Sequence, residues 1–247
     1  MPARDRAVRI VVLAHDLLGT YGDLGNGTVL AARLRWRGLD AELVVHEGGR
    51  AVPASADIYL LGGGEDAPQS LAFAELAATN ALAAAVDGGA VLLGVCAGYQ
   101  LLGHRFRTTD GRDLPGFGLL DVETLPGGSL PRAVGEITVQ PDVALGIPTL
   151  TGFENHGGRT YLGADARPLG RVLTGIGNTG SDGTEGAYTG TVVGTYLHGP
   201  VLVRNPALAD LLLSWVVGPL EPLVEPEVEA LRTERLAAVD NGRRRRR

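Results

Sequence analysis

The sequence contains no lysine, so all 22 of its basic residues are arginines. This absence excludes a nucleotide-binding P-loop of the lysine type, a Schiff-base lysine and a lysine general base. If the reaction uses ATP, we therefore expect another chain to bind it, and we expect no cofactor in this one.

Cysteine is almost absent too, because Cys96 is the one cysteine in 247 residues. An internal disulfide and a multi-cysteine metal site are excluded, which predicts a reducing compartment, the cytoplasm, and no metal. Long apolar runs are also lacking: the segment Leu208–Val217 is interrupted by Asp210 and Ser214, so we expect no transmembrane segment. The charged start of the chain does not resemble a secretory signal.

The net charge of −6 includes five terminal arginines, so the rest of the chain is more acidic still. An acidic body argues against nucleic acid as a partner. We expect residues 241–247 to form a solvated arginine-rich tail, with weak attraction to the inner face of the membrane as the alternative.

Short apolar runs alternate with helix-like segments through the first hundred residues, which predicts an α/β fold with a mostly parallel sheet between helices. The expected strands are Val8–Ala14, Ala41–His46, Ile58–Leu61 and Ala90–Val95. One helix is expected from a cap at Asn26 or Thr28 to about Arg37, and another from the turn containing Pro68 to about Val86. With its length and apolar content, the chain fits one domain over residues 1–240.

After Gly103 the sequence becomes rich in glycine, proline and threonine, with alternating patterns at 135–140 and 190–197. These predict a smaller antiparallel extension. The glycine-rich segment 175–190 is expected to be a mobile loop or hairpin tip. Helices are expected from Pro206 to just before Gly218 and from Glu225 to Val239.

Cys96 lies between two glycines in the segment Gly94-Val-Cys-Ala-Gly98, directly after an apolar strand. A turn from strand into helix forces its central residue into a strained backbone conformation and needs small neighbours two positions away. The new helix would lower the thiol pKa and favour thiolate. Its first N–H group, that of Ala97, would form half of an oxyanion hole.

A cysteine nucleophile needs a base, and we choose His198 among the five histidines because it follows the predicted strand at 192–197. His104 is expected at the surface. The glycine run Gly62-Gly-Gly64 also follows a strand, so Gly63 could supply the second half of the oxyanion hole; the alternative is a simple tight turn.

Four segments, 62–66, 94–103, 152–156 and 194–200, together resemble class I glutamine amidotransferases of the cobyric-acid-synthase-like branch. The segments 21–26, 157–160 and 177–186 are most similar to GatD-type glutaminase subunits of lipid II isoglutaminyl synthases. The resemblance implies a flavodoxin-like class I glutamine amidotransferase fold spanning most of the chain.

The resemblance also implies that Cys96 attacks the side-chain amide of glutamine, that His198 protonates the departing ammonia, and that water releases glutamate from the thioester. It implies that Arg132 binds the glutamine α-carboxylate, where a surface arginine is the alternative, and it suggests further substrate contacts. These would come from Gly62, Gly64, Tyr99 and Gln100.

The implied partner is a MurT-like ligase subunit, which would bind ATP and Mg and amidate the D-glutamate α-carboxylate of lipid II. Two alternatives remain: another acceptor, such as a corrinoid carboxylate, or a cysteine hydrolase of the wider elbow superfamily. A regulatory module without activity is disfavoured by the presence of both Cys96 and His198.

The sequence departs from most of these enzymes in one position, because Pro200 stands where an acidic residue usually orients the histidine. Either a distant carboxylate such as Glu154 orients His198, or the partner subunit supplies a group. We favour the second hypothesis.

Overall fold

The computed structural model describes residues 6–108 and 110–245, and side chains up to residue 239. Its central sheet has the strand order β13-β14-β4-β3-β1-β2, parallel from β14 to β2, with β13 antiparallel at one edge. Its strands are β1 (Val8–Leu13), β2 (Ala41–Val45), β3 (Ile58–Leu61), β4 (Val91–Val95), β13 (Ala187–Thr189) and β14 (Val192–Thr195).

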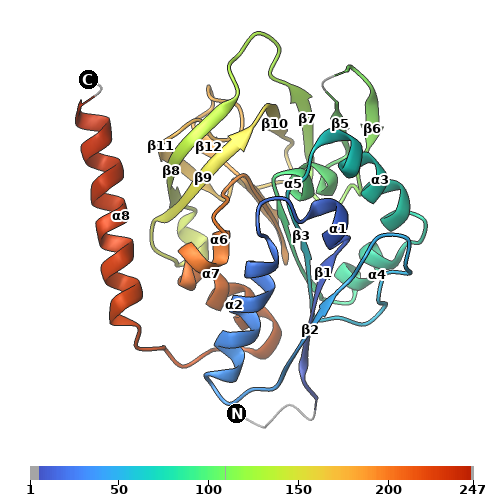
Figure 1. Ribbon diagram of the computed structural model, residues 1–247, viewed down its shortest axis with the longest axis horizontal. Coiled ribbons are helices and arrows are strands. Elements are labelled where there is room, and N and C mark those ends of the chain that lie inside the picture. The colour runs from blue at the N-terminus through green and yellow to red at the C-terminus, as the bar shows by residue number, and fades with distance from the viewer. Residues whose placement is uncertain (1–5, 109, 246–247) are drawn as a thin grey trace.

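Helices cover both faces of this sheet (Figure 1). The helices α2 (Leu24–Arg35), α6 (Val201–Arg204) and α7 (Pro206–Val217) pack together on one face. The other face carries α3 (Asp66–Leu76), α4 (Ala81–Asp87) and α5 (Ala97–Leu102), and the short α1 (His15–Leu18) contacts α3. All residues of β3 and β4 are buried, as expected for central strands with helices on both sides.

The α/β fold and its mostly parallel sheet are confirmed, and the four strands expected in the first hundred residues agree with the structure to within one residue at each end. Two details of the helices were wrong. The first helix begins at Leu24, so Asn26 and Thr28 lie inside it, and Asn26 instead accepts a hydrogen bond from Leu202 N–H (2.9 Å). The alanine-rich segment forms two helices, α3 and α4, separated by a turn at Ala77-Ala78 and a bend at Thr79-Asn80, and the last two residues are weak helix formers.

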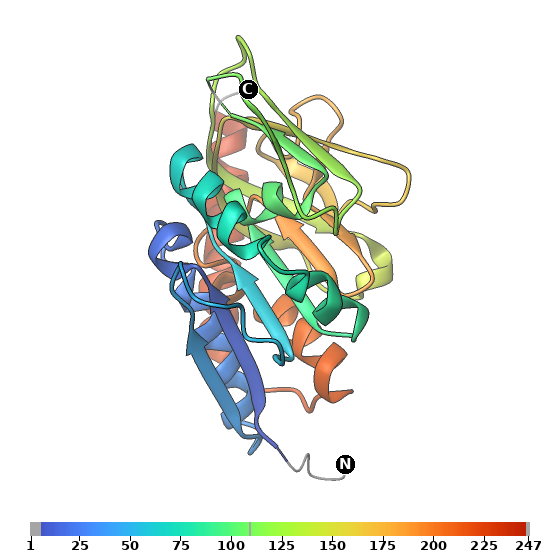
Figure 2. The same ribbon diagram turned by 90° about the vertical axis from the view of Figure 1, so that its right-hand side faces the viewer.

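The second half of the chain forms the expected extension, as two four-stranded sheets whose strand pairs are antiparallel except for the parallel pair β5–β7 (Figure 2). Their orders are β10-β7-β5-β6 and β12-β11-β8-β9. The strands are β5 (Arg105–Arg107), β6 (Asp113–Pro115), β7 (Val122–Pro126), β8 (Ala133–Pro141), β9 (Leu150–His156), β10 (Gly158–Leu162), β11 (Gly170–Thr174) and β12 (Thr184–Glu185), with a 3-10 turn, η1 (Val143–Leu145), between β8 and β9.

The segment 175–190, expected to be a mobile loop or hairpin tip, is instead a packed part of the fold. It contains β12 and β13, and the side chains of Asn178 and Glu185 are fully buried. Asn178 bonds to the backbone of Gly186 in both directions (2.9 and 3.0 Å). Its glycines therefore permit close packing where we had expected mobility.

The last helix, α8 (Pro226–Arg245), lies alongside the sheet that contains β8 and β11 (Figure 1). Arg232 anchors it by donating to the backbone oxygens of Arg204 (3.0 Å) and Thr149 (2.8 Å). The helix extends beyond the expected end at Val239, and Arg246 and Arg247 of the predicted tail lie outside the described residues.

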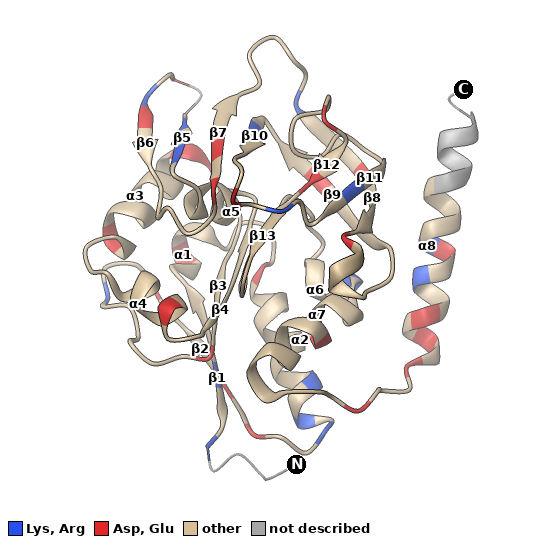
Figure 3. Ribbon diagram, turned by 180° about the vertical axis from the view of Figure 1, so that it is seen from behind, with Lys and Arg blue, Asp and Glu red and all other residues tan. Residues whose placement is uncertain are grey.

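No helix within the described ranges is both long and apolar enough to cross a membrane. Arginines and carboxylates are interspersed over the face seen in Figure 3, outside the segments drawn in grey.

Candidate active site

Cys96 occupies the turn between β4 and α5, as the sequence predicts. Its backbone has φ 54° and ψ −106°, and Ala14 is the other non-glycine residue with positive φ in the described part of the chain. Such a conformation costs on the order of 1–3 kcal/mol and persists where the surrounding structure enforces it. The Cys96 N–H donates to Thr195 O (2.8 Å), which ties the turn to the end of β14.

The two glycines that flank Cys96 are required by close backbone packing. A Cβ at Gly94 would lie 2.7 Å from the carbonyl of Gly98, and a Cβ at Gly98 would lie 2.5 Å from Leu61 O. Gly98 N–H also donates to Gly62 O (3.0 Å). The elbow is thus locked against β3, and the sequence-based explanation of these glycines is confirmed.

His198 follows β14, the strand parallel to and beside β4. Its backbone pairs with Phe153 of β9 through two hydrogen bonds (2.9 and 3.1 Å). The topology therefore places Cys96 and His198 past the same ends of adjacent strands. Both ring nitrogens of His198 are buried and have no hydrogen-bond partner among the described residues.

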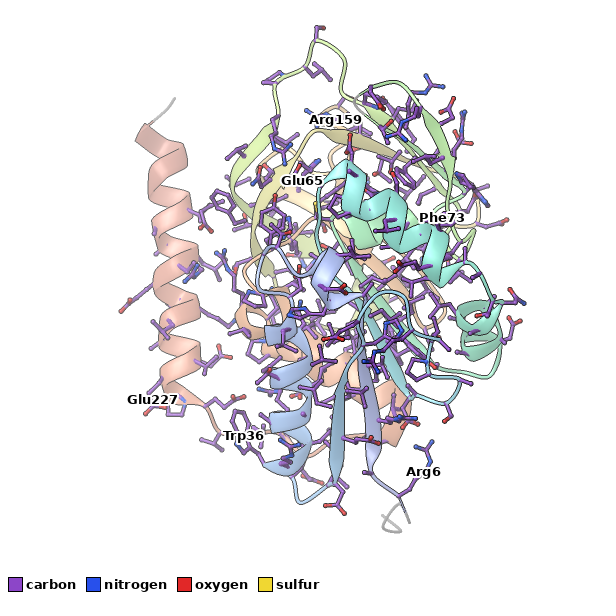
Figure 4. All side chains as sticks on the ribbon, turned by 45° about the vertical axis from the view of Figure 1, so that its right-hand side comes forward. Arg6, Trp36, Glu65, Phe73, Arg159 and Glu227 are labelled. Carbon is purple, nitrogen blue, oxygen red and sulfur yellow. The ribbon has the colours of Figure 1, made fainter. Side chains whose placement is uncertain are left out.

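Tyr21, in the loop between α1 and α2, packs on the ring of His198 with centroids 4.5 Å apart. Its hydroxyl donates to Oε1 of Glu65 (3.3 Å). Glu65 immediately precedes α3, as Figure 4 shows. A Cβ at Gly63 would meet both the Tyr21 ring (2.6 Å) and the His198 ring (3.1 Å). Tyr21 therefore contacts the His198 ring from one side, with the two ring planes tilted by 50°.

Burial sets the charge states of the Cys96 thiol and the His198 imidazole. It raises the pKa of the Cys96 thiol to about 12, with a further increase from the nearby Asp23 carboxylate. Burial also lowers the pKa of His198 to about 4, and the charges of His156 and Arg132 act in the same direction. The expected thiolate is therefore wrong for the free chain, in which thiol and imidazole are both neutral.

The glycine run 62–64 lies directly behind the elbow. Gly64 lines the same cavity as Cys96, whereas Gly62 and Gly63 are not among the lining residues. The Gly63 N–H, predicted to form half of the oxyanion hole, donates to Asp23 Oδ2 (2.7 Å). Ala97 N–H, the other predicted half, acts on the Cys96 sulfur and lowers the pKa of its thiol, against the larger effect of burial.

Cys96 opens into a cavity of about 420 Å³. Arg132 and Gln100, which we expect to bind substrate, line it together with His156 and Glu65. Arg132 is an exposed side chain whose Nε donates to Asn155 Oδ1 (2.7 Å) and whose Nη2 donates to Asn155 O (3.2 Å). The guanidinium is thereby oriented by β9, and a small anion in the cavity would lie within its field.

Tyr99, which we expected to contact substrate, is fully buried and is not part of the cavity wall. Its ring packs against Gly194 of β14 and edge-on against Tyr196, with centroids 5.2 Å apart. Because α5 turns this residue toward the sheet, Tyr99 is a core residue, and a substrate contact from its side chain is not compatible with this structure.

His156 lines the cavity, although we had predicted no role for it. Its ring stacks on Tyr196 (3.6 Å between centroids), and its Nδ1 lies 2.9 Å from Gly158 O. The Tyr196 hydroxyl in turn contacts Thr160 Oγ1 (2.6 Å) and accepts from Gln100 Nε2 (3.1 Å). The signal in the sequence that could have indicated this role is the presence of histidine and aromatic residues in both segments 152–160 and 194–198.

Glu154, one of two candidates to orient His198, does not do so in this structure. Its carboxylate accepts hydrogen bonds from the backbone N–H groups of Ile176 (2.7 Å) and Gly177 (2.9 Å). Pro200, at the position usual for the acidic residue, lies against α2, where a Cβ on Gly25 would be 2.5 Å from its ring. Within the described residues there is also no cluster of three or more His, Cys, Asp or Glu side chains that could hold a metal ion.

The chain is similar in sequence to amidotransferases with a known reaction. It is 39% identical over 200 residues to the GatD subunit of the glutamine-hydrolysing lipid II isoglutaminyl synthase of Staphylococcus aureus, covering 80% of this chain and 79% of that one. The GatD subunit of Streptococcus pneumoniae is 34% identical over 213 residues, covering 84% and 79%. A probable cobyric acid synthase of Methanopyrus kandleri is 40% identical over 147 residues, but these are 28% of its length.

The fold matches that of solved amidotransferase structures. A crystal structure of a glutamine amidotransferase superposes with a TM-score of 0.59 over 84% of this chain and 98% of that chain, at 18% identity. The glutaminase domain of the Trypanosoma brucei CTPS, solved with bound acivicin, gives 0.51 over 87% and 96%, at 11% identity. Residues 9–206 match the family model of the CobB/CobQ-like glutamine amidotransferase domain, and the chain belongs to this family of class I glutamine amidotransferases.

Proposed function

We propose that this chain is the glutamine-hydrolysing subunit of a lipid II isoglutaminyl synthase. The observation that carries the proposal is the strained Cys96 elbow, which opens into a cavity lined by an oriented arginine and lies beside the strand that leads to His198. The two GatD relatives, each matched over most of its length, support the choice of reaction.

In the proposed mechanism, Arg132 binds the α-carboxylate of glutamine, because a planar guanidinium matches a carboxylate with two parallel hydrogen bonds. The thiol proton passes to His198 as the Cys96 sulfur attacks the side-chain amide carbon. The oxyanion that forms accepts a hydrogen bond from Ala97 N–H.

His198 then gives its proton to the amide nitrogen, the C–N bond breaks, and ammonia leaves behind a thioester on Cys96. Water attacks the thioester, the C–S bond breaks, glutamate is released and the Cys96 thiol is regenerated. Glutamine and water are thus converted to glutamate and ammonia, with no redox change.

The group that orients His198 in this proposal comes from a partner subunit. Both nitrogens of the ring lack a partner within the described chain, and Glu154 and Pro200 do not supply one. A buried nitrogen without a hydrogen bond is costly, so a donor or acceptor brought by another chain would be favourable. The free chain should accordingly be a poor glutaminase.

We assign the acceptor step to a MurT-like ligase that binds ATP and Mg and amidates the D-glutamate α-carboxylate of lipid II. The lack of lysine in this chain fits an ATP site elsewhere. A corrinoid carboxylate is a weaker candidate, since the cobyric acid synthase relatives are about three times longer than the matched segment. We place the subunit in the cytoplasm, where a catalytic thiol stays reduced.

The proposal is tested by measuring ammonia release from glutamine for the chain alone and for its complex with the ligase subunit. We expect the complex to be faster, and Cys96→Ser to abolish release in both, because the hydroxyl is a far weaker nucleophile at neutral pH. Labelling of Cys96 by a glutamine-like chloroketone, blocked by glutamine, is the matched binding control. Equal rates with and without the ligase would contradict the partner-supplied group, and release by the Cys96→Ser variant would contradict the mechanism.

A further inference from the structure

The Asp23 carboxylate is a buried acidic group that the mechanism above does not use. It directly precedes α2 and is 3% exposed. Its Oδ2 accepts the Gly63 N–H (2.7 Å), and its Oδ1 accepts from Asn26 Nδ2 (3.3 Å). In the part of the chain that the structure describes, no arginine or histidine forms an ion pair with it, so its charge is compensated by these two N–H donors alone.

Asp23 is connected to the elbow through the glycine run. Gly63 follows Gly62, and the Gly62 carbonyl accepts the N–H of Gly98, two residues beyond the cysteine. The Asp23 carboxylate thus lies close enough to Cys96 for its charge to disfavour the thiolate. An oxyanion held against the glycine run would meet the same negative charge.

We propose that Asp23 is a positioning residue that restrains the glutaminase site of the free chain, because its carboxylate holds the Gly63 N–H that would otherwise stabilise the oxyanion. This inference rests on the proposed function of Cys96. A carboxylate and an oxyanion are alternative acceptors for one donor, and the two anions repel each other at short range. Activation therefore requires that the Gly63 N–H be released from Asp23, or that Asp23 be neutral.

The buried position supports this competition, since burial raises the pKa of Asp23 to about 6 even though both of its hydrogen bonds favour the anion. The carboxyl is therefore costly to keep ionised, and a contact that favours its neutral form would loosen its hold on Gly63.

Other groups also face the Cys96 sulfur, and they must be separated from Asp23 in any test. Glu65 raises the pKa of the thiol and Arg132 lowers it. The Tyr21 and Tyr196 hydroxyls also interact with it electrostatically, and the neutral His198 is the proposed base. Asp23 differs from these groups because it combines a charge with a hydrogen bond to the glycine run.

The test compares Asp23→Asn and Asp23→Ala in the full chain, free and in complex with the ligase subunit. Asparagine keeps the size and an acceptor oxygen but removes the charge, and alanine also frees the Gly63 N–H. The matched control is Asp16→Asn, since Asp16 accepts the N–H of Gly48 (2.8 Å) at an exposed turn.

The first readout is the rate at which iodoacetamide alkylates Cys96 as a function of pH, which reports thiolate directly. We expect Asp23→Asn to shift the midpoint to lower pH and to raise the rate below that midpoint about tenfold, which corresponds to about one pKa unit. The second readout is ammonia release by the free chain. We expect about a tenfold gain for Asp23→Asn and a larger gain for Asp23→Ala, with Asp16→Asn unchanged in both assays.

An unchanged alkylation midpoint in Asp23→Asn, or slower glutamine hydrolysis by a folded variant, would overturn the proposal and make Asp23 a support of the loop. If Asp23→Ala does not fold, the asparagine variant decides alone. A shifted midpoint with no ammonia release from any variant, even with the ligase, would leave the restraint on the thiol standing and refute the proposed glutaminase function instead.

Discussion

Replacing Gly98 with alanine tests the elbow most directly. The added Cβ would lie 2.5 Å from Leu61 O and 2.7 Å from Leu61 Cβ, both on the neighbouring strand β3. Neither atom can yield cheaply, because β3 is fully buried and paired on both sides. Overpacking of this kind costs about 1–3 kcal/mol, and loss of the Gly98–Gly62 hydrogen bond adds about 1 kcal/mol.

We therefore expect Gly98→Ala to lower the free energy of unfolding by about 2–4 kcal/mol, or the melting temperature by roughly 4–16 °C. The displaced elbow should also lower kcat/KM for glutamine by about a hundredfold, because a shift near 1 Å in a nucleophile has that effect. Urea unfolding followed by circular dichroism and ammonia release by the ligase complex measure the two quantities.

The control for this substitution is Gly38→Ala, at a glycine that follows α2. Gly38 has φ +72°, and a Cβ there would meet nothing within 4 Å. This variant should lose about 1–2 kcal/mol from backbone strain alone and keep full activity. Unfolding and kinetics of Gly98→Ala that match those of Gly38→Ala would refute the packing explanation of the elbow.

Two further predictions concern charge. Burial raises the pKa of Glu185 to about 7 from 4.5, so its neutral form is favoured in the folded chain. The wild-type chain should therefore lose about 3 kcal/mol of stability relative to Glu185→Gln as pH rises from 4.5 to 7. Urea titrations that show the same pH dependence of the free energy of unfolding for both proteins would contradict this. Arg132→Lys should raise KM for glutamine about tenfold to a hundredfold with kcat nearly unchanged, because lysine cannot reproduce the planar donor pair. The free energy of unfolding should change by no more than about 0.5 kcal/mol, because the side chain is exposed. Steady-state kinetics on the complex and a urea titration measure the two effects, and a fall in kcat at constant KM would mean that Arg132 acts in chemistry instead of binding.

The elbow was predictable from sequence because its causes are local. An apolar strand, two flanking glycines and a short helix lie within a few residues of Cys96, and the steric rules that place a small residue on each side act at that range. His198 was chosen because it follows a predicted strand, and its place beside the elbow depends on β14 and β4 being parallel neighbours, which the structure shows.

Contacts between segments that lie far apart in the chain could not be predicted from local sequence patterns. The bond from Gly63 to Asp23 joins residues 40 positions apart, and nothing in either segment alone indicates it. Tyr99 was expected to contact the substrate on the family resemblance, but the rotation of α5 directs its ring onto Gly194 of β14. The same limit explains why segment 175–190 was expected to be mobile, although Gly186 packs against Gly194 of β14 and Gly177 against Val172 of β11.

The charge state of the thiol shows which of two opposing effects dominates. A helix N-terminus typically stabilises an anion by about 0.3–1 kcal/mol, and α5 has six residues. Raising the thiol pKa from 9.0 to about 12 corresponds to about 4 kcal/mol against the thiolate, so burial and the Asp23 charge outweigh the helix. A nucleophile held neutral in this way gains reactivity only when its surroundings change, and glutamine hydrolysis can then be confined to the complex that uses the ammonia.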